Sequence, residues 1–111
     1  MPALSSISIV VPAFNEARRL PQTLDRIVAF AASRPAIREI IVVDDGSTDA
    51  TRGVVEDFAA RLPTVRPISY GANRGKGFAI RTGVLALTSD FVLITDADLS
   101  TPIEEIDTLA A

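Results

Sequence analysis

The chain has 111 residues, a hydrophobic fraction of 48% and a formal net charge of -3. This is the size and composition of one folded domain, which excludes a disordered segment. The chain contains no Cys and no His, so it holds no disulfide, no thiolate or imidazole metal ligand and no Ser-His-Asp triad. Its acidic balance argues against nucleic acid as a partner, because phosphate backbones require a basic surface.

The chain is expected to be cytoplasmic. Its apolar runs fall far short of the roughly 18 residues that a membrane-spanning helix needs. The first six residues lack the basic and apolar pattern of a secretory signal. The absence of Cys also fits a reducing compartment.

Four short segments rich in β-branched residues predict strands, at residues 7–11, 39–43, 65–69 and 91–95. Within them, residues 40–43 and 91–94 are apolar at every position. That pattern is typical of strands buried on both faces of a parallel sheet.

The segments that follow the strands have apolar residues at helical spacing. The first helix is expected to hold Pro21 in its first turn, where proline is tolerated. The second is expected to end before Pro63 and to begin at a cap supplied by Ser47, Thr48 or Asp49. A third is expected over about residues 77–88, and a fourth from near Pro102. The alternating order predicts an α/β fold with a parallel sheet flanked by helices.

Polar residues cluster after each predicted strand, at the edge of the sheet where ligands bind in such folds. Carboxylates roughly 4 Å apart repel by about 4 kcal/mol at an effective dielectric near 20, so their convergence calls for a cation or for hydrogen-bond donors, and a divalent ion is the simplest answer. Because His and Cys are absent, we expect Mg²⁺ or Mn²⁺. This edge gathers Glu16, Asp44, Asp45, Asp49, Asp96 and Asp98 against Arg74 and Lys76.

The segments of this edge also have simpler interpretations. Asp96-Ala97-Asp98 is either a metal site or a surface turn that caps the next helix. Residues 44–47 are either a tight turn or part of the cleft, and both hold if Asp44 supports the loop while Asp45 faces the ligand. Residues 12–16 are either a pocket wall or a strand end with capping residues. The glycines of residues 73–77 would let backbone amides approach a phosphate, although neither a Walker A loop nor a Gly-x-Gly-x-x-Gly run is present.

Four runs, in this order and spacing, resemble the start of family 2 inverting glycosyltransferases with the GT-A fold. They are IVVPAFNE at residues 9–16, VVDDGSTD at 42–49, NRGKG at 73–77 and TDAD at 95–98. Residues 96–102 most resemble the branch that contains dolichyl-phosphate glucosyltransferases and polyprenyl-phosphate mannosyltransferases. The resemblance covers nearly the whole chain and implies that residues 1–111 form the Rossmann-like, nucleotide-sugar-binding half of a GT-A fold, cut short at its C-terminus.

The resemblance also implies roles for individual residues. Asp45 would accept a hydrogen bond from the base, with Asp44 supporting its loop. Asp96 and Asp98 would flank Ala97 in the DXD element and hold the metal ion that bridges the diphosphate, and Lys76 would assist the phosphates together with Arg74. The nucleotide pocket would be lined by Pro12, Ala13, Asn15 and Glu16. Phe14 stands where many relatives carry Tyr, and Ser100 where some carry Gln near the metal.

The resemblance implies transfer of a hexose from a UDP- or GDP-sugar, with inversion, to a polyprenyl phosphate at the inner face of a membrane. The acceptor side and the catalytic carboxylate of this family lie beyond residue 111, so no catalytic base is assigned. A non-catalytic module that binds a nucleotide sugar is the main alternative. A haloacid dehalogenase-type phosphotransferase and a nucleotidyltransferase are weaker alternatives, because the Asp-x-Asp run closes the fourth strand and no basic Gly-rich loop follows the first.

Overall fold

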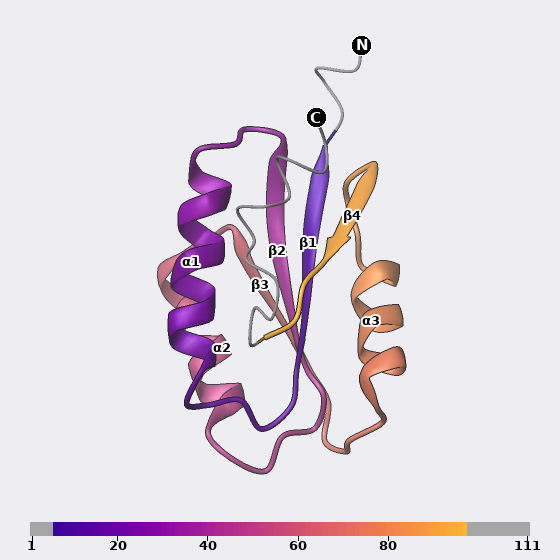
Figure 1. The fold of residues 1–111 in the computed structure, drawn as a ribbon. Helices are drawn as coiled ribbons and strands as arrows, with labels where there is room; N and C mark the ends of the chain where they lie inside the picture. Colours follow the sequence, from indigo (N-terminus) through magenta and orange to yellow (C-terminus); the bar gives the residue numbers. More distant parts are fainter. Residues whose placement is uncertain (1–5, 98–111) are drawn as a thin grey trace.

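The computed structural model describes residues 6–97 and shows a parallel sheet at the centre of the molecule (Figure 1). The sheet has the strand order β3-β2-β1-β4. Its strands are β1 (Ile7–Ala13), β2 (Ile37–Asp44), β3 (Val65–Ser69) and β4 (Phe91–Ile94). The predicted strands are therefore confirmed to within two residues at each end. Pro67 lies in β3, an edge strand, where the lack of an amide proton is tolerated.

Three helices connect the described strands: α1 (Leu20–Ala32), α2 (Thr51–Arg61) and α3 (Lys76–Leu85). α1 and α2 cover one face of the sheet, and α3 covers the other (Figure 1). The predicted α/β fold is confirmed. The helix expected near Pro102 lies outside the described residues. In residues 6–97, no helix is both long and apolar enough to cross a membrane.

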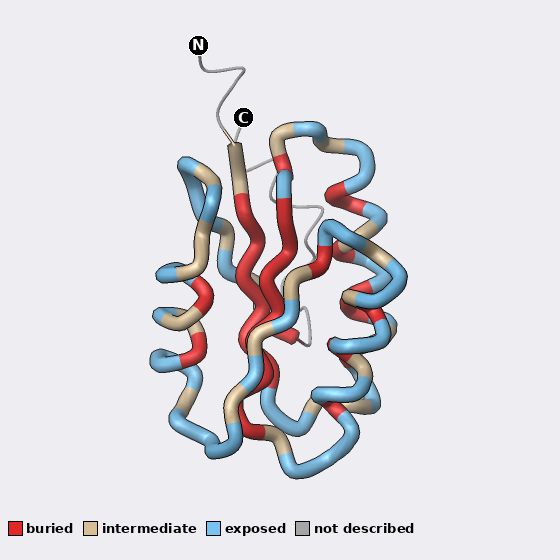
Figure 2. Tube along the Cα trace, turned by 180° about the vertical axis from the view of Figure 1, so that it is seen from behind, coloured by how far each residue is buried: buried red, intermediate tan, exposed pale blue. Residues whose placement is uncertain are grey.

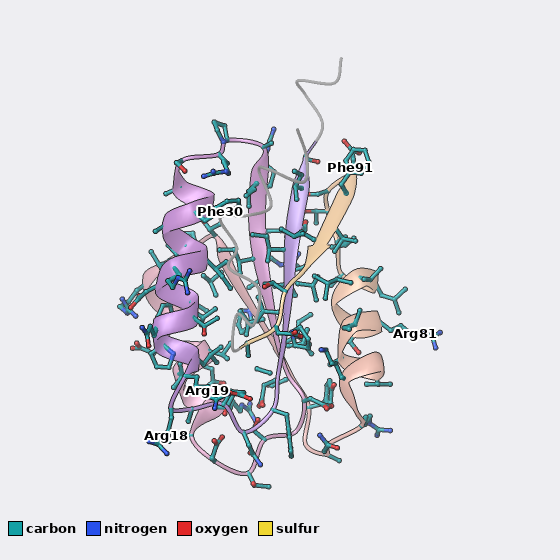
Figure 3. All side chains as sticks on the ribbon, in the orientation of Figure 1. Arg18, Arg19, Phe30, Arg81 and Phe91 are labelled. Atoms are coloured by element: carbon teal, nitrogen blue, oxygen red, sulfur yellow. The ribbon has the colours of Figure 1, made fainter. Side chains whose placement is uncertain are left out.

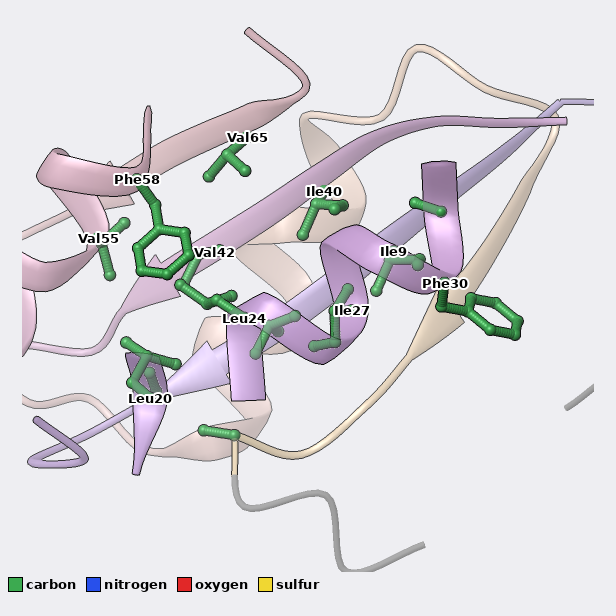
Figure 4. Packing of buried hydrophobic residues seen from close by; sticks show 14 of the residues in the cluster. Ile9, Leu20, Leu24, Ile27, Phe30, Ile40, Val42, Val55, Phe58 and Val65 are labelled. Atoms are coloured by element: carbon green, nitrogen blue, oxygen red, sulfur yellow. The ribbon is translucent and has the colours of Figure 1, made fainter. Parts of the chain in front are cut away.

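The core follows from the alternation of side chains along β1 and β2. Ile9 and Ile40 face α1 and α2, where they pack in a cluster with Leu24 and Phe58 (Figure 4). The intervening residues, such as Val10, face α3. Both central strands are buried along almost their whole length, which Figure 2 shows as two adjacent red tracks. Residues 40–43 thus have the burial on both faces that their sequence predicts.

α3 lies close to the sheet because its inner face is made of small residues. Ala79 and Gly83 are its buried positions. A Cβ atom added at Gly83 would lie 2.6 Å from Cγ1 of Val10, too close for a real contact. The larger side chains of α3 face outward, and Figure 3 shows Arg81 pointing away from the sheet. The close packing of α3 fixes the position of its N-terminus, which begins at Lys76.

The expected burial of β4 on both faces is wrong for the described structure. Phe91 is 58% exposed and Ile94 is 43% exposed. The reason is its place at the edge of the sheet, where β4 pairs only with β1 in the described part of the chain. A run of apolar residues indicates a preference for burial, but it does not specify whether the strand lies at the centre or at the edge of the sheet.

The buried carboxylate of Glu39 links the strands near their amino ends, at the end of the sheet opposite the polar cluster. The Glu39 carboxylate accepts hydrogen bonds from the Ser8 hydroxyl at 2.5 Å, from the Thr88 amide and hydroxyl at 3.0 Å each, and from Nη1 of Arg66 at 2.5 Å. Burial alone would raise the pKa of Glu39, but these four donors outweigh it and lower the pKa from 4.5 to about 2. Glu39 therefore remains ionised and ties β1, β2, β3 and the α3–β4 loop together.

Candidate functional site

A cavity of about 350 Å³ opens where β1, β2 and β4 end. β1 and β2 run toward the lower end of the sheet in Figure 1. The position of the cavity is the one that an open parallel sheet provides for ligands. β1 and its following loop supply one wall, and the start of α3 supplies the opposite one. The lining residues are Pro12, Ala13, Phe14, Glu16, Asp45, Asn73, Gly75, Lys76, Ala79, Asp96 and Ala97.

The sequence assigned ten residues to a nucleotide-sugar pocket, and the structure brings most of them together. Asn15, in the β1–α1 loop, and Asp44, the last residue of β2, do not line the cavity, and Asp98 lies outside the described residues. The role of each residue in binding stays a prediction. The assigned residues that line the cavity are Pro12, Ala13, Glu16, Asp45, Lys76, Asp96 and Ala97.

Sequence reasoning assigned no pocket role to four lining residues: Phe14, Asn73, Gly75 and Ala79. Asn73 and Gly75 belong to the Gly-rich run that was considered for phosphate contacts, so a signal for them existed. Ala79 faces the cavity from the buried side of α3. Its exposure to the cavity depends on how closely the helix packs, which the sequence does not specify.

Asn15 shapes the loop that follows β1. Its φ of 51° lies in the left-handed region, which Asn tolerates better than most residues. Its side-chain Oδ1 accepts hydrogen bonds from the amides of Thr48 at 2.9 Å and Asp49 at 3.3 Å, and its own amide donates to Oγ of Ser47 at 2.9 Å. Asn15 therefore joins the β1–α1 loop to the β2–α2 loop beside the cavity.

Two further bonds fasten the same pair of loops. The Glu16 amide donates to Oγ1 of Thr51 at 2.8 Å, and the Ala17 amide donates to Oδ2 of Asp49 at 3.3 Å. Asp49 also accepts from the Thr51 amide at 2.8 Å. Hydrogen bonds from the Thr51 side chain and backbone lower the pKa of Asp49 despite a counteracting effect of burial. Among the three predicted caps of α2, Asp49 is thus the residue that bonds to the first helical amide, although the N-cap position itself is Ala50.

The two aspartates after β2 have different surroundings. Asp44 accepts the Ser47 amide at 3.1 Å and thereby supports the turn, as expected. Asp45 faces the cavity and the β3–α3 loop, and its carboxylate accepts hydrogen bonds from Tyr70, Asn73, Arg74 and Gly75. Burial, followed by the bond to Asp45, raises the pKa of Tyr70 well above its ordinary value.

Gly46 allows the β2–α2 loop to contact the β3–α3 loop. Its φ of +66° is left-handed, and an added Cβ would lie 2.2 Å from the carbonyl carbon of Ala72. No other residue fits here without moving the backbone. The backbone of the β2–α2 loop therefore packs directly against the backbone of the β3–α3 loop.

Lys76 and Asp96 face each other across the mouth of the cavity, with Nζ 2.5 Å from Oδ1. Asp96 thus lines the cavity with a carboxylate, the type of ligand that Mg²⁺ takes in proteins, and one of its oxygens is paired with the Lys76 ammonium. Within residues 6–97, no three acidic side chains gather as a metal cluster. Arg74 lies with its guanidinium carbon 5.4 Å from the Phe78 ring centroid and does not line the cavity.

The fold matches that of GT-A structures, among them a mannosyltransferase. A mannosyltransferase from Pyrobaculum calidifontis, solved with GDP-Man and Mn²⁺, has a TM-score of 0.76 and 33% identity, over 85% of this chain and 28% of its own. S. aureus TarS, solved with UDP, has a TM-score of 0.73 and 26% identity, over 84% of this chain and 27% of its own.

Comparison of the sequence with known families and proteins identifies the family. The model described as Glycosyl transferase family 2 matches residues 8–111. A dolichyl-phosphate beta-glucosyltransferase of Trichomonas vaginalis is 39% identical over 97% of this chain and 35% of its own length. A bactoprenol glucosyl transferase of Shigella phage SfX is 39% identical over 93% and 34%. The chain belongs to glycosyl transferase family 2, and it spans about a third of the length of the curated relatives it matches.

This assignment confirms the resemblance drawn from the four sequence runs. It leaves the phosphotransferase and nucleotidyltransferase alternatives without support.

Proposed function

We propose that this chain forms the nucleotide-sugar site of an inverting glycosyltransferase that moves a hexose from UDP or GDP to a polyprenyl phosphate. The observation that carries the proposal is the cavity at the carboxyl ends of the strands, with Asp96 and Lys76 at its mouth. The relatives named for dolichyl-phosphate and bactoprenol glucosyl transfer support the lipid acceptor.

In this proposal the donor lies across the cavity, between the β1–α1 loop and the start of α3. Pro12 and Ala13 give the cavity an apolar surface suited to a base or ribose, and Lys76 and Asp96 give it charged groups. Glu16 and Asp96 make the cavity acidic, so a free diphosphate would be repelled unless cations accompany it.

Asp96, together with Asp98 of the same motif, would hold Mg²⁺ or Mn²⁺. The ion supplies charge stabilisation to the nucleoside diphosphate as it leaves the anomeric carbon. The Mn²⁺ in the Pyrobaculum calidifontis mannosyltransferase structure supports this choice of ion. Lys76 holds its ammonium beside Asp96 and would contact the phosphate oxygens directly.

The acceptor would attack the sugar from the face opposite the diphosphate, because inversion requires it. A phosphate acceptor is already anionic and needs little help from a general base. We assign no base to this chain. The enzyme would act in the cytoplasm, at the inner face of the membrane that contains its lipid acceptor.

The test is calorimetric titration of the chain with UDP, GDP and their hexose conjugates, with and without Mn²⁺. We expect Mn²⁺-dependent binding of one nucleotide, lost in Asp96→Asn and in Asp98→Ala and retained in Asp57→Asn, an exposed position on α2. Nucleotide binding with the same affinity without Mn²⁺ and in Asp96→Asn would overturn the proposed donor site. So would the absence of binding to every nucleotide.

A further inference from the structure

The side chain of Tyr70 is held on two sides, next to the cavity. Tyr70 follows β3 and packs against the buried cluster that faces α3, which includes Val10, Val43 and Ala79. Its ring also meets the ring of Phe78, in the first turn of α3, edge to face, with the ring centroids 5.3 Å apart. Tyr70 is not among the described residues that line the cavity. An effect of Tyr70 on a bound ligand therefore has to pass through another residue.

The residue that Tyr70 contacts on the cavity side is Asp45. The Tyr70 hydroxyl donates at 2.7 Å to Oδ1 of Asp45, an oxygen that also accepts the Arg74 amide at 2.9 Å. A hydroxyl that donates to an ionised carboxylate forms one of the stronger hydrogen bonds in proteins. Asp45 is only 3% exposed, yet it lines the cavity. Tyr70 thus fixes one oxygen of a carboxylate that a ligand in the cavity would meet.

The other oxygen of Asp45 is bonded by groups that line the cavity themselves. Oδ2 accepts Nδ2 of Asn73 at 2.8 Å and the Gly75 amide at 3.0 Å, and both residues belong to the cavity lining. Nδ2 of Asn73 also donates to the Asp45 backbone carbonyl at 3.2 Å. A donor from a ligand can therefore take a place on Oδ2 while Nδ2 of Asn73 keeps the carbonyl.

An acceptor in this position favours a ligand group that donates hydrogen bonds. An ionised carboxylate only accepts them, so it repels phosphate oxygens and suits N–H groups. Uracil and guanine carry N–H groups on their Watson–Crick edges, which proteins read by hydrogen bonds. The apolar surface suited to the ring of such a base is close by, at Pro12, Ala13 and Phe14.

We propose that Tyr70 is a positioning residue for recognition of the donor's base: its hydroxyl holds Oδ1 of Asp45 and thereby presents Oδ2 to the N–H groups of uracil or guanine. The proposal rests on the proposed function for the identity of the ligand. It adds to the role that the resemblance implies for Asp45, because it names the side chain that holds the carboxylate in place.

The first test is calorimetric titration of Tyr70→Phe with UDP, GDP and pyrophosphate, each with Mn²⁺. Phenylalanine keeps the ring that packs against Phe78 and removes only the hydroxyl. We expect the nucleotide that the wild type binds to bind about tenfold more weakly, as for one lost hydrogen bond to a charged group, and pyrophosphate to bind unchanged. Ser69→Ala removes a hydroxyl from the exposed neighbour of Tyr70 and, as the control, should leave both affinities unchanged. Equal losses for nucleotide and pyrophosphate, or an unchanged nucleotide affinity, would overturn the proposal.

The second test needs no variant. Tyr70 is the sole tyrosine of the chain, so isotope-labelled tyrosine gives one Cζ resonance in NMR spectra, and this resonance responds to the hydrogen bond of the hydroxyl. The nucleotide should shift it, because the base binds the carboxylate that Tyr70 contacts, whereas pyrophosphate should leave it in place. A resonance that moves equally with both ligands, or with neither, would refute the role of Tyr70.

The proposed function and the role of Tyr70 fail in different ways. If the wild-type chain binds neither a nucleotide nor pyrophosphate, the proposed donor site is wrong and the role of Tyr70 is wrong with it. If the wild type binds a nucleotide with Mn²⁺ and Tyr70→Phe binds it equally well, the donor site is supported and only the role of Tyr70 is refuted.

Discussion

The buried Glu39 carboxylate makes a quantitative prediction about stability. Its pKa is about 2 in the folded chain and 4.5 in the unfolded reference, because four hydrogen bonds outweigh the effect of burial. A difference of this size corresponds to about 3 kcal/mol. Because the folded pKa is the lower one, this stabilisation is complete above pH 4.5 and is lost as the pH falls toward 2.

The perturbation is Glu39→Gln. Glutamine keeps one carbonyl oxygen for Thr88, but it presents an amide group to Nη1 of Arg66, which is itself a donor. We expect a loss of about 2–3 kcal/mol in the free energy of unfolding at neutral pH, since the charge is removed from a carboxylate that is only 7% exposed and is bound by several donors. Urea denaturation at a series of pH values measures it, and the variant should lose less stability than the wild type on acidification.

Glu56→Gln is the matched control. Glu56 pairs with Arg52 one helical turn away on α2, and its side chain is 57% exposed. Such pairs contribute at most about 0.5 kcal/mol. If Glu39→Gln costs no more than Glu56→Gln, or if acid affects the Glu39→Gln variant and the wild type equally, the reasoning about the buried carboxylate is wrong.

Three further predictions concern the loops around the cavity. Gly46→Ala should lower the free energy of unfolding by at least about 2 kcal/mol, because its Cβ would meet the Ala72 backbone at 2.2 Å. Gly53→Ala, with nothing within 4 Å, should instead add up to about 1 kcal/mol; urea titrations that rank the two equally would contradict this. Lys76→Ala should weaken Mn²⁺-pyrophosphate about tenfold in calorimetry, and unchanged affinity would remove Lys76 from the site. Asn15→Ala should speed amide exchange at Thr48, whose acceptor it deletes; unchanged exchange would show that Asn15 does not fix the loop.

The sequence was most informative where local pattern and topology coincide. Alternating strands and helices implied a parallel sheet, and the carboxyl ends of such strands must share one edge. This topology places Glu16, Lys76 and Asp96 at the carboxyl ends of the strands, and all three line the cavity there. The role of Asp44 in its turn also followed from short-range hydrogen-bonding rules.

The structure departs from the prediction where long-range packing decides the result. The run at residues 91–94 is apolar throughout, but strand order places it at an edge. The partners of Asp45 come from residues 25 to 30 positions away. Those of Glu39 come from three other segments of the chain. No spacing rule in the sequence links such groups, because the sheet register brings them together.

The most direct test of the donor site is paramagnetic broadening of amide resonances by Mn²⁺ in the presence of the nucleotide that binds. The account predicts loss of signal at the residues lining the cavity, such as Ala13, Gly75 and Ala97, and intact signals at Glu39 and Thr88 near the opposite edge of the sheet. Broadening should weaken when Asp96 is replaced by Asn. Broadening centred near Glu39, or spread evenly over the chain, would contradict the claim that this cavity binds a metal-nucleotide complex.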